Sequence, residues 1–183
     1  MPSLMCQYHC FFLKSCNSDA RCRHASVLGK LGDSAAIPYL IEAFRDSEDY
    51  VCRSIVSALS KFGDDAIPPL LNAVADKNEY VRRYAIEALG ELKSEAALNT
   101  LHSLFTSNLD QEKVAIAEAL GNIGDVSSIP LLNDLDENSS IFLKCNVQNA
   151  YSAIGSKNPQ SIIENLKHPS VQVRRRTDRK SVV

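Results

Sequence analysis

The sequence predicts an all-α fold, a right-handed α-solenoid (α-α superhelix) built from short helix-turn-helix repeats. A phrase of glutamate, alanine, leucine and glycine recurs along the chain, with its clearest copies in Glu87–Leu92 and Glu118–Gly124. The positions that close successive copies lie 31, 30, 31 and 31 residues apart; they hold Gly32, Gly63, Lys93, Gly124 and Gly155. A fixed period in this range is the signature of a solenoid. The composition, 45% hydrophobic and 23% charged, is that of a folded globular protein.

The first helix of each repeat is predicted from apolar residues at helical spacing, as in Ile37, Leu40, Ile41 and Phe44. Proline stands at the beginning of several of these helices, where its missing amide costs nothing and its fixed φ favours the first turn. Equivalent positions along the chain are expected to form one buried column: Leu40, Leu70, Leu101, Leu132 and Ile163.

The second helix of each repeat follows an acidic or polar turn, and its buried side is expected to carry Val81, Ala85, Ala88 and Leu89 or their equivalents. The small alanines let neighbouring helices approach closely. The glycine that follows can adopt the left-handed conformation that ends a helix at low steric cost.

The repeats extend over residues 19–175, as five units and the beginning of a sixth. Residues 1–18 match no repeat and are expected to form an irregular leader that contains cysteines. Residues 176–183 lack the alanine and leucine core of a second helix and are expected to be an irregular tail. An interrupted last unit would leave apolar surface bare, which favours self-association or a partner.

The charge and the apolar runs exclude several classes of protein. The 20 basic and 22 acidic side chains give a net charge of -2, so no positive field favours nucleic acid. The apolar runs are shorter than the ~20 residues that a membrane helix needs. The beginning of the chain has no basic, hydrophobic leader, so we expect a cytoplasmic protein whose six cysteines are free thiols.

The second-helix pattern carries a family resemblance. Asp76, Val81, Arg82, Ala85 and the closing Ala88-Leu89-Gly90, followed by a further helix, resemble the phycobilisome (PBS) lyase HEAT-like repeat. This resemblance implies a HEAT-like fold over about residues 19–175. Similar proteins include bilin lyase subunits, phycobilisome-degradation factors and general binding scaffolds, so the resemblance specifies the fold more closely than the activity. Lys93, Leu98 and Glu112 depart from the pattern.

The candidate binding site lies on the side of the second helices that lines the concave surface in similar proteins. Aromatic and arginine residues, which dominate binding hot spots, gather there in the second and third units. The predicted partner- or ligand-binding residues are Tyr50, Arg53, Tyr80, Arg83, Tyr84 and Glu87.

A column of basic residues occupies one equivalent slot of the second helices: Arg21, Arg82, Lys113, Lys144 and Arg174, with Cys52 in the remaining slot. In HEAT-like families an aspartate six residues earlier pairs with this arginine, and Asp76 and Arg82 have that spacing. The column is interpreted as a ladder that braces the repeats, and phosphate binding is the alternative.

The first 24 residues contain a group of thiols and imidazoles, the side chains that suit zinc: Cys6, His9, Cys10, Cys16, Cys22 and His24. Their spacing fits no common finger or ribbon, so no metal site is assigned and a leader with free thiols is preferred. The sequence has no phosphate loop, no His-Glu-x-x-His and no Gly-x-Ser-x-Gly, so no catalytic residue is assigned either. His102 is interpreted as a boundary residue of its helix.

Two functions remain open. The first is a scaffold, without an enzymatic activity of its own, that binds a protein partner on the concave face. The second, implied by the family resemblance, is a bilin lyase subunit or related phycobilisome factor that holds an open-chain tetrapyrrole, with arginines meeting its propionates. No resident cofactor is expected. The partner would be a protein, such as a phycobiliprotein or a second HEAT-like subunit, with no nucleic acid and no membrane involved.

Overall fold

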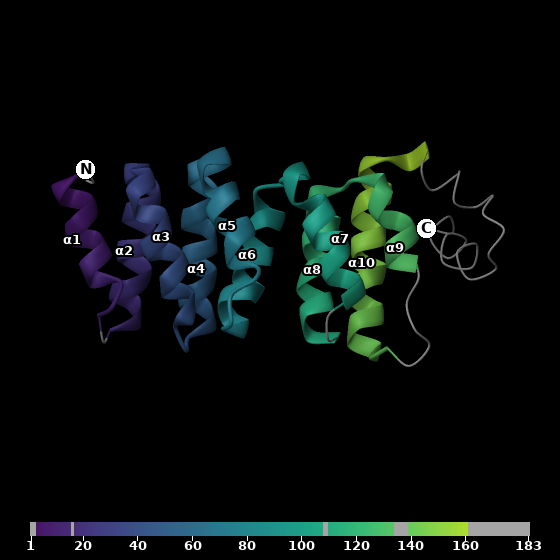
Figure 1. Cartoon of the computed structure of the whole chain (residues 1–183), viewed down its shortest axis with the longest axis horizontal. Helices are drawn as coiled ribbons and strands as arrows, with labels where there is room; N and C mark the ends of the chain where they lie inside the picture. Colours follow the sequence, from purple (N-terminus) through teal and green to yellow (C-terminus); the bar gives the residue numbers. More distant parts are fainter. Residues whose placement is uncertain (1–2, 16, 108–109, 134–138, 161–183) are drawn as a thin grey trace. The chain divides into compact units, whose positions relative to one another are not determined.

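The computed structural model describes residues 3–15, 17–107, 110–133 and 139–160. These residues form α-helices, short 3₁₀ helices and connections, and none of them is in a strand. The chain divides into two compact units, Met1–Ala97 (unit 1) and Leu98–Val183 (unit 2), and each is described by itself. The prediction of an all-α solenoid is confirmed (Figure 1).

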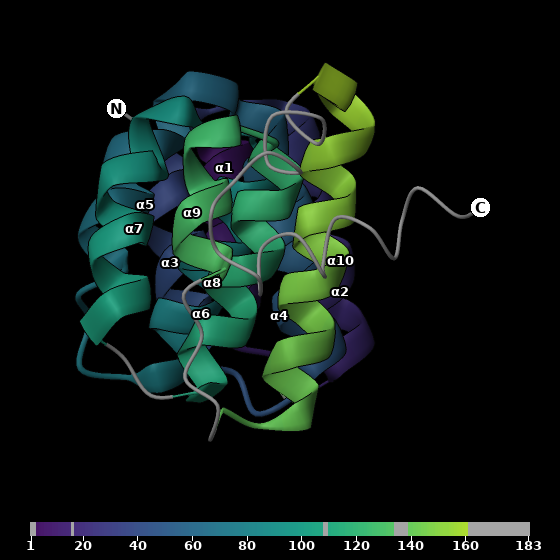
Figure 2. The same cartoon turned by 90° about the vertical axis from the view of Figure 1, so that its right-hand side faces the viewer.

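Unit 1 consists of three helix pairs in sequence. Its elements are α1 (Leu4–Phe12), α2 (Ser18–Leu31), η1 (Ser34–Ala36), α3 (Ile37–Glu42), η2 (Ala43–Arg45), α4 (Asp49–Leu59), η3 (Ser60–Ala66), α5 (Ile67–Ala73), α6 (Glu79–Glu91) and η4 (Glu95–Ala97). The second helices pack in order, α2 on α4 and α4 on α6, and α3 packs on α5. Figure 2 shows α3 and α5 on one side of unit 1 and the second helices α2 and α4 on the other.

Unit 2 contains α7 (Leu98–Ser107), α8 (Asp110–Ile123), η5 (Val126–Ser128), α9 (Ile129–Asn133) and α10 (Ile141–Lys157). The second helices α8 and α10 pack closely together. Among the described residues, no helix is long and apolar enough to cross a membrane.

The predicted helix signals act locally as expected. Pro38 and Pro68 occupy the first turns of α3 and α5. Asn78 caps α6, its side chain accepting from the Tyr80 and Val81 amides. Lys93, the residue that replaces a glycine, takes a left-handed φ of 53° just after α6, as the repeat position demands. Gly155 differs from this expectation, because α10 continues through it to Lys157.

The core follows the repeat. Leu40 and Leu70 of the expected column are fully buried in unit 1, as are Leu101 and Leu132 in unit 2, whereas Ile163 lies outside the described residues. Close helix approach depends on small residues. A Cβ at Gly29 would come within 2.9 Å of the Ala58 backbone, so α2 and α4 could not pack this closely with a larger residue there.

The description of residues 1–18 as an irregular leader needs a correction. The leader is not irregular over its length, because Leu4–Phe12 form α1, with Ser3 as N-cap, and α1 packs on α2. Cys6 and Cys10 on the inner side of this helix are buried, and so is its C-cap residue, Leu13. Its sequence lacks the repeat phrase, so the 31-residue register gave no sign of it. Residues 161–175 of the predicted solenoid and the expected tail, 176–183, lie outside the described residues.

Candidate binding face on the second helices

Four of the six predicted binding residues are available at the surface of unit 1. Tyr50 and Tyr80 each stand in the first turn of a second helix, α4 and α6, and about half of each residue is exposed. The side chains of Arg53 and Arg83, one turn further along the same two helices, are also about half exposed. We call these four residues the second-helix face.

The arginines are held by carboxylates that connect the two helices. Arg53 Nε donates to Asp49 Oδ2 at 2.8 Å on its own helix, and Arg53 Nη1 donates to Glu87 Oε1 at 3.0 Å on α6. Arg83 Nη2 lies 3.7 Å from Asp49 Oδ1. Asp49 therefore interacts with both arginines. Glu87, a predicted binding residue, is mostly covered and supports Arg53 instead of facing solvent.

Tyr84 is placed differently from the prediction. It was expected on the outward surface, but only 1% of the residue is exposed. Its ring stacks on Phe44 of η2 with centroids 5.6 Å apart, and its hydroxyl donates to Asp49. Ser54, in the equivalent slot of α4, also reaches the preceding repeat, where its hydroxyl donates to the Cys22 carbonyl at 3.4 Å, but it has no ring to stack on that repeat. Tyr84 is a core residue that positions Asp49.

The electrostatics of this network favour the charged form of Asp49. The hydrogen bond from Tyr84 is the largest cause that lowers the pKa of Asp49, and the bond from Arg53 is the next. Burial and the same bond to Asp49 raise the pKa of Tyr84 well above its usual value. Asp49 is therefore ionised, and Tyr84 stays a neutral donor, throughout the physiological range.

Sequence reasoning did not identify Asp49. An acidic residue in the first turn of a helix is common, because it interacts favourably with the helix dipole. The signal that could have found it is the Asp49 and Arg53 pair at i, i+4, the spacing at which helix side chains meet. Its bond to Tyr84 depends on contact between repeats and has no sequence signature.

The basic column has the structural role that was expected, through a different contact. Arg21 Nη1 donates to the Ser15 carbonyl at 2.8 Å, and Arg82 Nη1 donates to the Asp76 carbonyl at 2.9 Å. Each acceptor lies six residues before its arginine, so the arginine fastens the turn that leads into the second helix. The expected pairing of this arginine with an aspartate along the stack is present at Arg21, which pairs with Asp46 of the next repeat, whereas the Asp76 carboxylate accepts from Arg45 at 3.0 Å. Arg174 lies outside the described residues.

The two imidazoles near the start of the chain join α1 to α2, and two of the thiols lie next to each other within α1. His9 Nδ1 and His24 Nδ1 share a hydrogen bond of 2.7 Å, and the Cys6 and Cys10 sulfurs lie 3.9 Å apart. Burial raises the pKa of Cys10 to about 12, so its thiol is protonated at neutral pH. Cys16 lies outside the described residues, among which no group of three or more histidine, cysteine or acidic side chains is placed to hold a metal.

His102 is the remaining histidine that the sequence singled out. Its Nε2 lies 2.8 Å from the hydroxyl of the buried Ser128, within unit 2. The contact ties α7 to η5, which agrees with the interpretation of His102 as a boundary residue.

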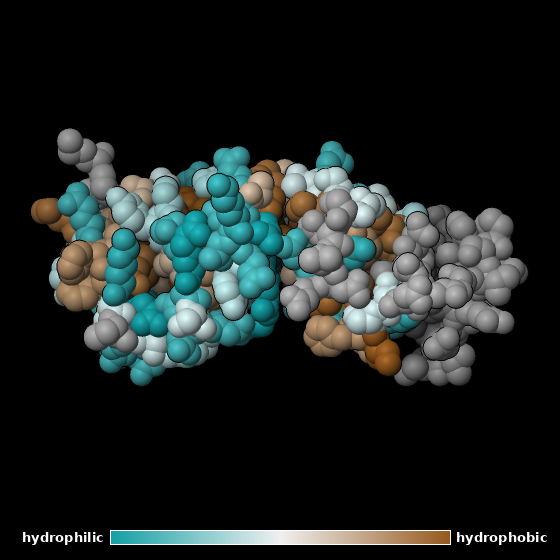
Figure 3. Space-filling view, turned by 60° about the horizontal axis from the view of Figure 1, so that its bottom comes forward, coloured by the Kyte–Doolittle hydropathy of each residue, from teal (hydrophilic) through white to brown (hydrophobic). Residues whose placement is uncertain are grey.

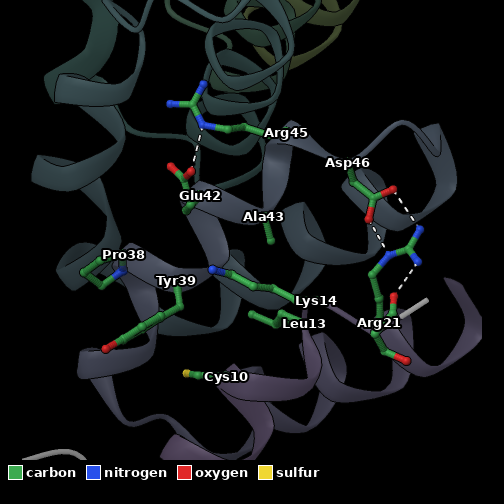
Figure 4. Close-up of a pocket in the computed structure, with 11 residues that line it drawn as sticks. Cys10, Leu13, Lys14, Arg21, Pro38, Tyr39, Glu42, Ala43, Arg45 and Asp46 are labelled. Carbon is green, nitrogen blue, oxygen red and sulfur yellow. Dashed lines mark hydrogen bonds and ion pairs between the residues drawn. The ribbon is translucent and has the colours of Figure 1, made fainter. Parts of the chain in front are cut away.

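A pocket of about 640 Å³ opens elsewhere in unit 1, between α1, α3 and η2 (Figure 4). Leu13 and Pro38 supply apolar surface, and its charged rim consists of Lys14 and the ion pairs Arg21–Asp46 and Arg45–Glu42. Both arginines of the rim are neutralised by their own carboxylates. The pocket contains none of the predicted binding residues, and the sequence gave no sign of it.

Comparisons with known proteins agree with this architecture. A family model for HEAT repeats matches residues 11–79 and 67–144. No match is found among curated proteins. Among solved structures, one chain of the complex of CpcE and CpcF of phycocyanin lyase from Nostoc sp. PCC7120 is similar, with 26% sequence identity and a TM-score of 0.58. The alignment covers 97% of this chain and 76% of that one.

Two designed armadillo repeat proteins are also similar, each at 16% identity, with TM-scores of 0.52 and 0.50. The alignments cover 95% and 96% of this chain and 97% of each designed chain, and the second was solved in complex with the peptide (KR)4. These two likenesses concern the fold alone. Because the family model spans more than half of the sequence, the chain belongs to the HEAT repeat family.

Proposed function

We propose that this protein is a binding scaffold that recognises a protein partner through the second-helix face of unit 1. The observation that carries the proposal is the presence of two half-exposed tyrosines and two half-exposed arginines on the adjacent helices α4 and α6. Tyrosine and arginine are the residue types that contribute most to protein interfaces, because they combine large contact area with directed hydrogen bonds.

The network around Asp49 supports this role. Asp49 partly holds Arg53 and Arg83 and so restricts their motion before binding. This lowers the entropic cost of ordering the two side chains when a partner binds. Their ion pairs are half exposed, and such pairs contribute only about 0.2–1 kcal/mol. A partner carboxylate can therefore replace Asp49 at small cost.

The test compares equally exposed tyrosines on the two layers of unit 1. A photo-crosslinking amino acid is placed at Tyr80 or at Tyr39 of α3, which is also about half exposed, and crosslinks are collected in the native host. A discrete partner is expected at Tyr80 and not at Tyr39. Once that partner is identified, Tyr80→Ala and Arg83→Ala should each lower the affinity of the chain for it more than about fivefold. Tyr39→Ala should leave it unchanged. Loss of binding in Tyr39→Ala alone would move the site to the first helices.

A second candidate, a bilin-handling subunit, is favoured by the likeness to a chain of the phycocyanin lyase complex. In that case Arg53 and Arg83 would meet the propionates of an open-chain tetrapyrrole, and Tyr50 and Tyr80 would contact its rings. Co-expression with a bilin separates the two functions. A visible absorbance that co-purifies with the chain, and is lost in an Arg53→Ala, Arg83→Ala variant, supports the subunit. A colourless protein that still binds its partner supports the scaffold.

A further inference from the structure

Helix α1 carries large apolar side chains on its exposed side. The exposed fraction is 85% for Leu4, 56% for Met5, 54% for Tyr8 and 76% for Phe11. We call these four residues the outer face of α1. Figure 3 shows brown and tan side chains gathered over the edge of unit 1 that α1 forms. The opposite side of the helix packs on α2 and η1. Gln7 is the one polar residue exposed among them on α1. Large apolar side chains that gather on an exposed face indicate an interaction surface, so the outer face calls for a partner.

The chemistry of this face limits what can cover it. From Leu4 to Leu13 the chain has no lysine, arginine, aspartate or glutamate. The one ionisable imidazole, His9, is buried against His24. Like charges would therefore not oppose each other if two identical faces met. The residues also have a nearly symmetric spacing, because the midpoint between Leu4 and Phe11 falls beside Tyr8, between Gln7 and Tyr8.

We propose that the outer face of α1 pairs with the same face of a second copy of this chain. In an antiparallel arrangement the two-fold axis passes beside Tyr8, and Leu4 of each copy meets Phe11 of the other. An isologous contact needs such a self-complementary patch. This direction also sets the helix dipoles in opposition and keeps the two Lys14 ammonium groups at opposite ends of the contact.

The area of the contact indicates a weak dimer. An aromatic side chain buries about 150–250 Å², and four side chains that are more than half exposed offer on the order of 500 Å² per copy. The dimer would then bury about 1,000 Å² in total, the lower limit of specific interfaces. The proposed dimer is therefore weak and reversible.

The first experiment is sedimentation of the whole chain from below to above micromolar concentration. The parent should shift from monomer to dimer. Tyr8→Glu should weaken association at least about tenfold, because it brings two carboxylates together across the axis. Phe11→Glu should weaken it at least about tenfold as well, because it sets an unpaired carboxylate against the apolar Leu4 of the other copy. The matched control is Phe142→Glu, which alters a comparably exposed aromatic residue of unit 2 and should leave the dimer intact. Circular dichroism establishes that each variant is folded.

The second experiment locates the contact directly. In a Cys16→Ser, Cys145→Ser background, which removes the thiol that is exposed among the described residues and the thiol nearest to α1 outside them, Tyr8→Cys should form an intermolecular disulfide on mild oxidation, and Tyr39→Cys should not. The proposal is overturned by a parent that stays monomeric, or by a dimer that survives both glutamate variants. It is also overturned by a monomer that co-sediments with phosphatidylcholine vesicles through Phe11, since α1 would then face a lipid surface.

Discussion

The change Tyr84→Phe tests whether Tyr84 is a core residue or a surface residue. It removes the hydroxyl that donates to Asp49 and keeps the ring against Phe44. A hydrogen bond to a charged group contributes about 1.5–3 kcal/mol. Asp49 keeps Arg53 and is half exposed to water, so we expect a loss near 1 kcal/mol. Tyr84→Ala also deletes a fully buried ring and should cost about 3–5 kcal/mol.

The free energy of unfolding is measured by urea denaturation for both variants. A pH series adds an independent check, because the pKa of Asp49 is lower in the folded chain than its ordinary value of 3.8, with Tyr84 the largest cause. The stability that this shift contributes is present above pH 3.8 and is lost as the pH falls through the folded pKa. The difference between the parent and Tyr84→Phe should therefore shrink below pH 3.8.

One result would refute this reasoning. If Tyr84→Ala unfolded at the same urea concentration as the parent, Tyr84 would be the outward residue that the repeat register predicted. The contact with Phe44 would then carry no stability. Equal losses in Tyr84→Phe and Tyr84→Ala would assign the whole effect to the hydroxyl.

Three further predictions concern the core, the histidine pair and the helix end. Leu70→Ala and Leu101→Ala should each cost about 2–5 kcal/mol, because both leucines are fully buried, while Tyr39→Ala, measured in the same urea series, should cost little. Burial and His9 lower the pKa of His24 below 6.5, so the free energy of unfolding should fall as the pH drops below 6.5. His24→Gln should reduce this pH dependence. A variant with the pH profile of the parent would contradict the assignment to His24. Lys93→Gly should raise the free energy of unfolding by up to about 1 kcal/mol, because it relieves the left-handed φ; a lower thermal midpoint would show that the lysine side chain contributes more than the strain costs.

The fold could be predicted because every repeat obeys the same local rules. Pro38 and Pro68 open their helices, and the left-handed position after α6 is kept even where Lys93 replaces the glycine. Helix α1 was not predicted because its buried residues are Cys6, Cys10 and the adjoining Leu13, and not the alanine and glycine of the repeat phrase. Its outer side also carries four large apolar residues, so the sequence shows no clear amphipathic stripe.

The candidate site was predicted less well because slot equivalence says nothing about side-chain length. Ser54 and Tyr84 occupy the same slot, yet the tyrosine extends to Phe44 and is buried. Glu87 was expected on the open surface, and it lies mostly covered beside Arg53. Both outcomes arise from contacts between neighbouring repeats, which a period in the sequence does not specify.

The same pairing of arginine with aspartate serves two purposes in unit 1, and burial decides which. Arg21 donates to both oxygens of Asp46, at 2.5 and 2.9 Å, and both side chains are almost fully covered. Removing either partner would leave a buried charge, so this pair is fixed in the structure. Arg53 and Asp49 are half exposed, and water can replace either partner at small cost. A partner protein can therefore compete for Arg53 but not for Arg21, which supports the second-helix face as the proposed binding surface.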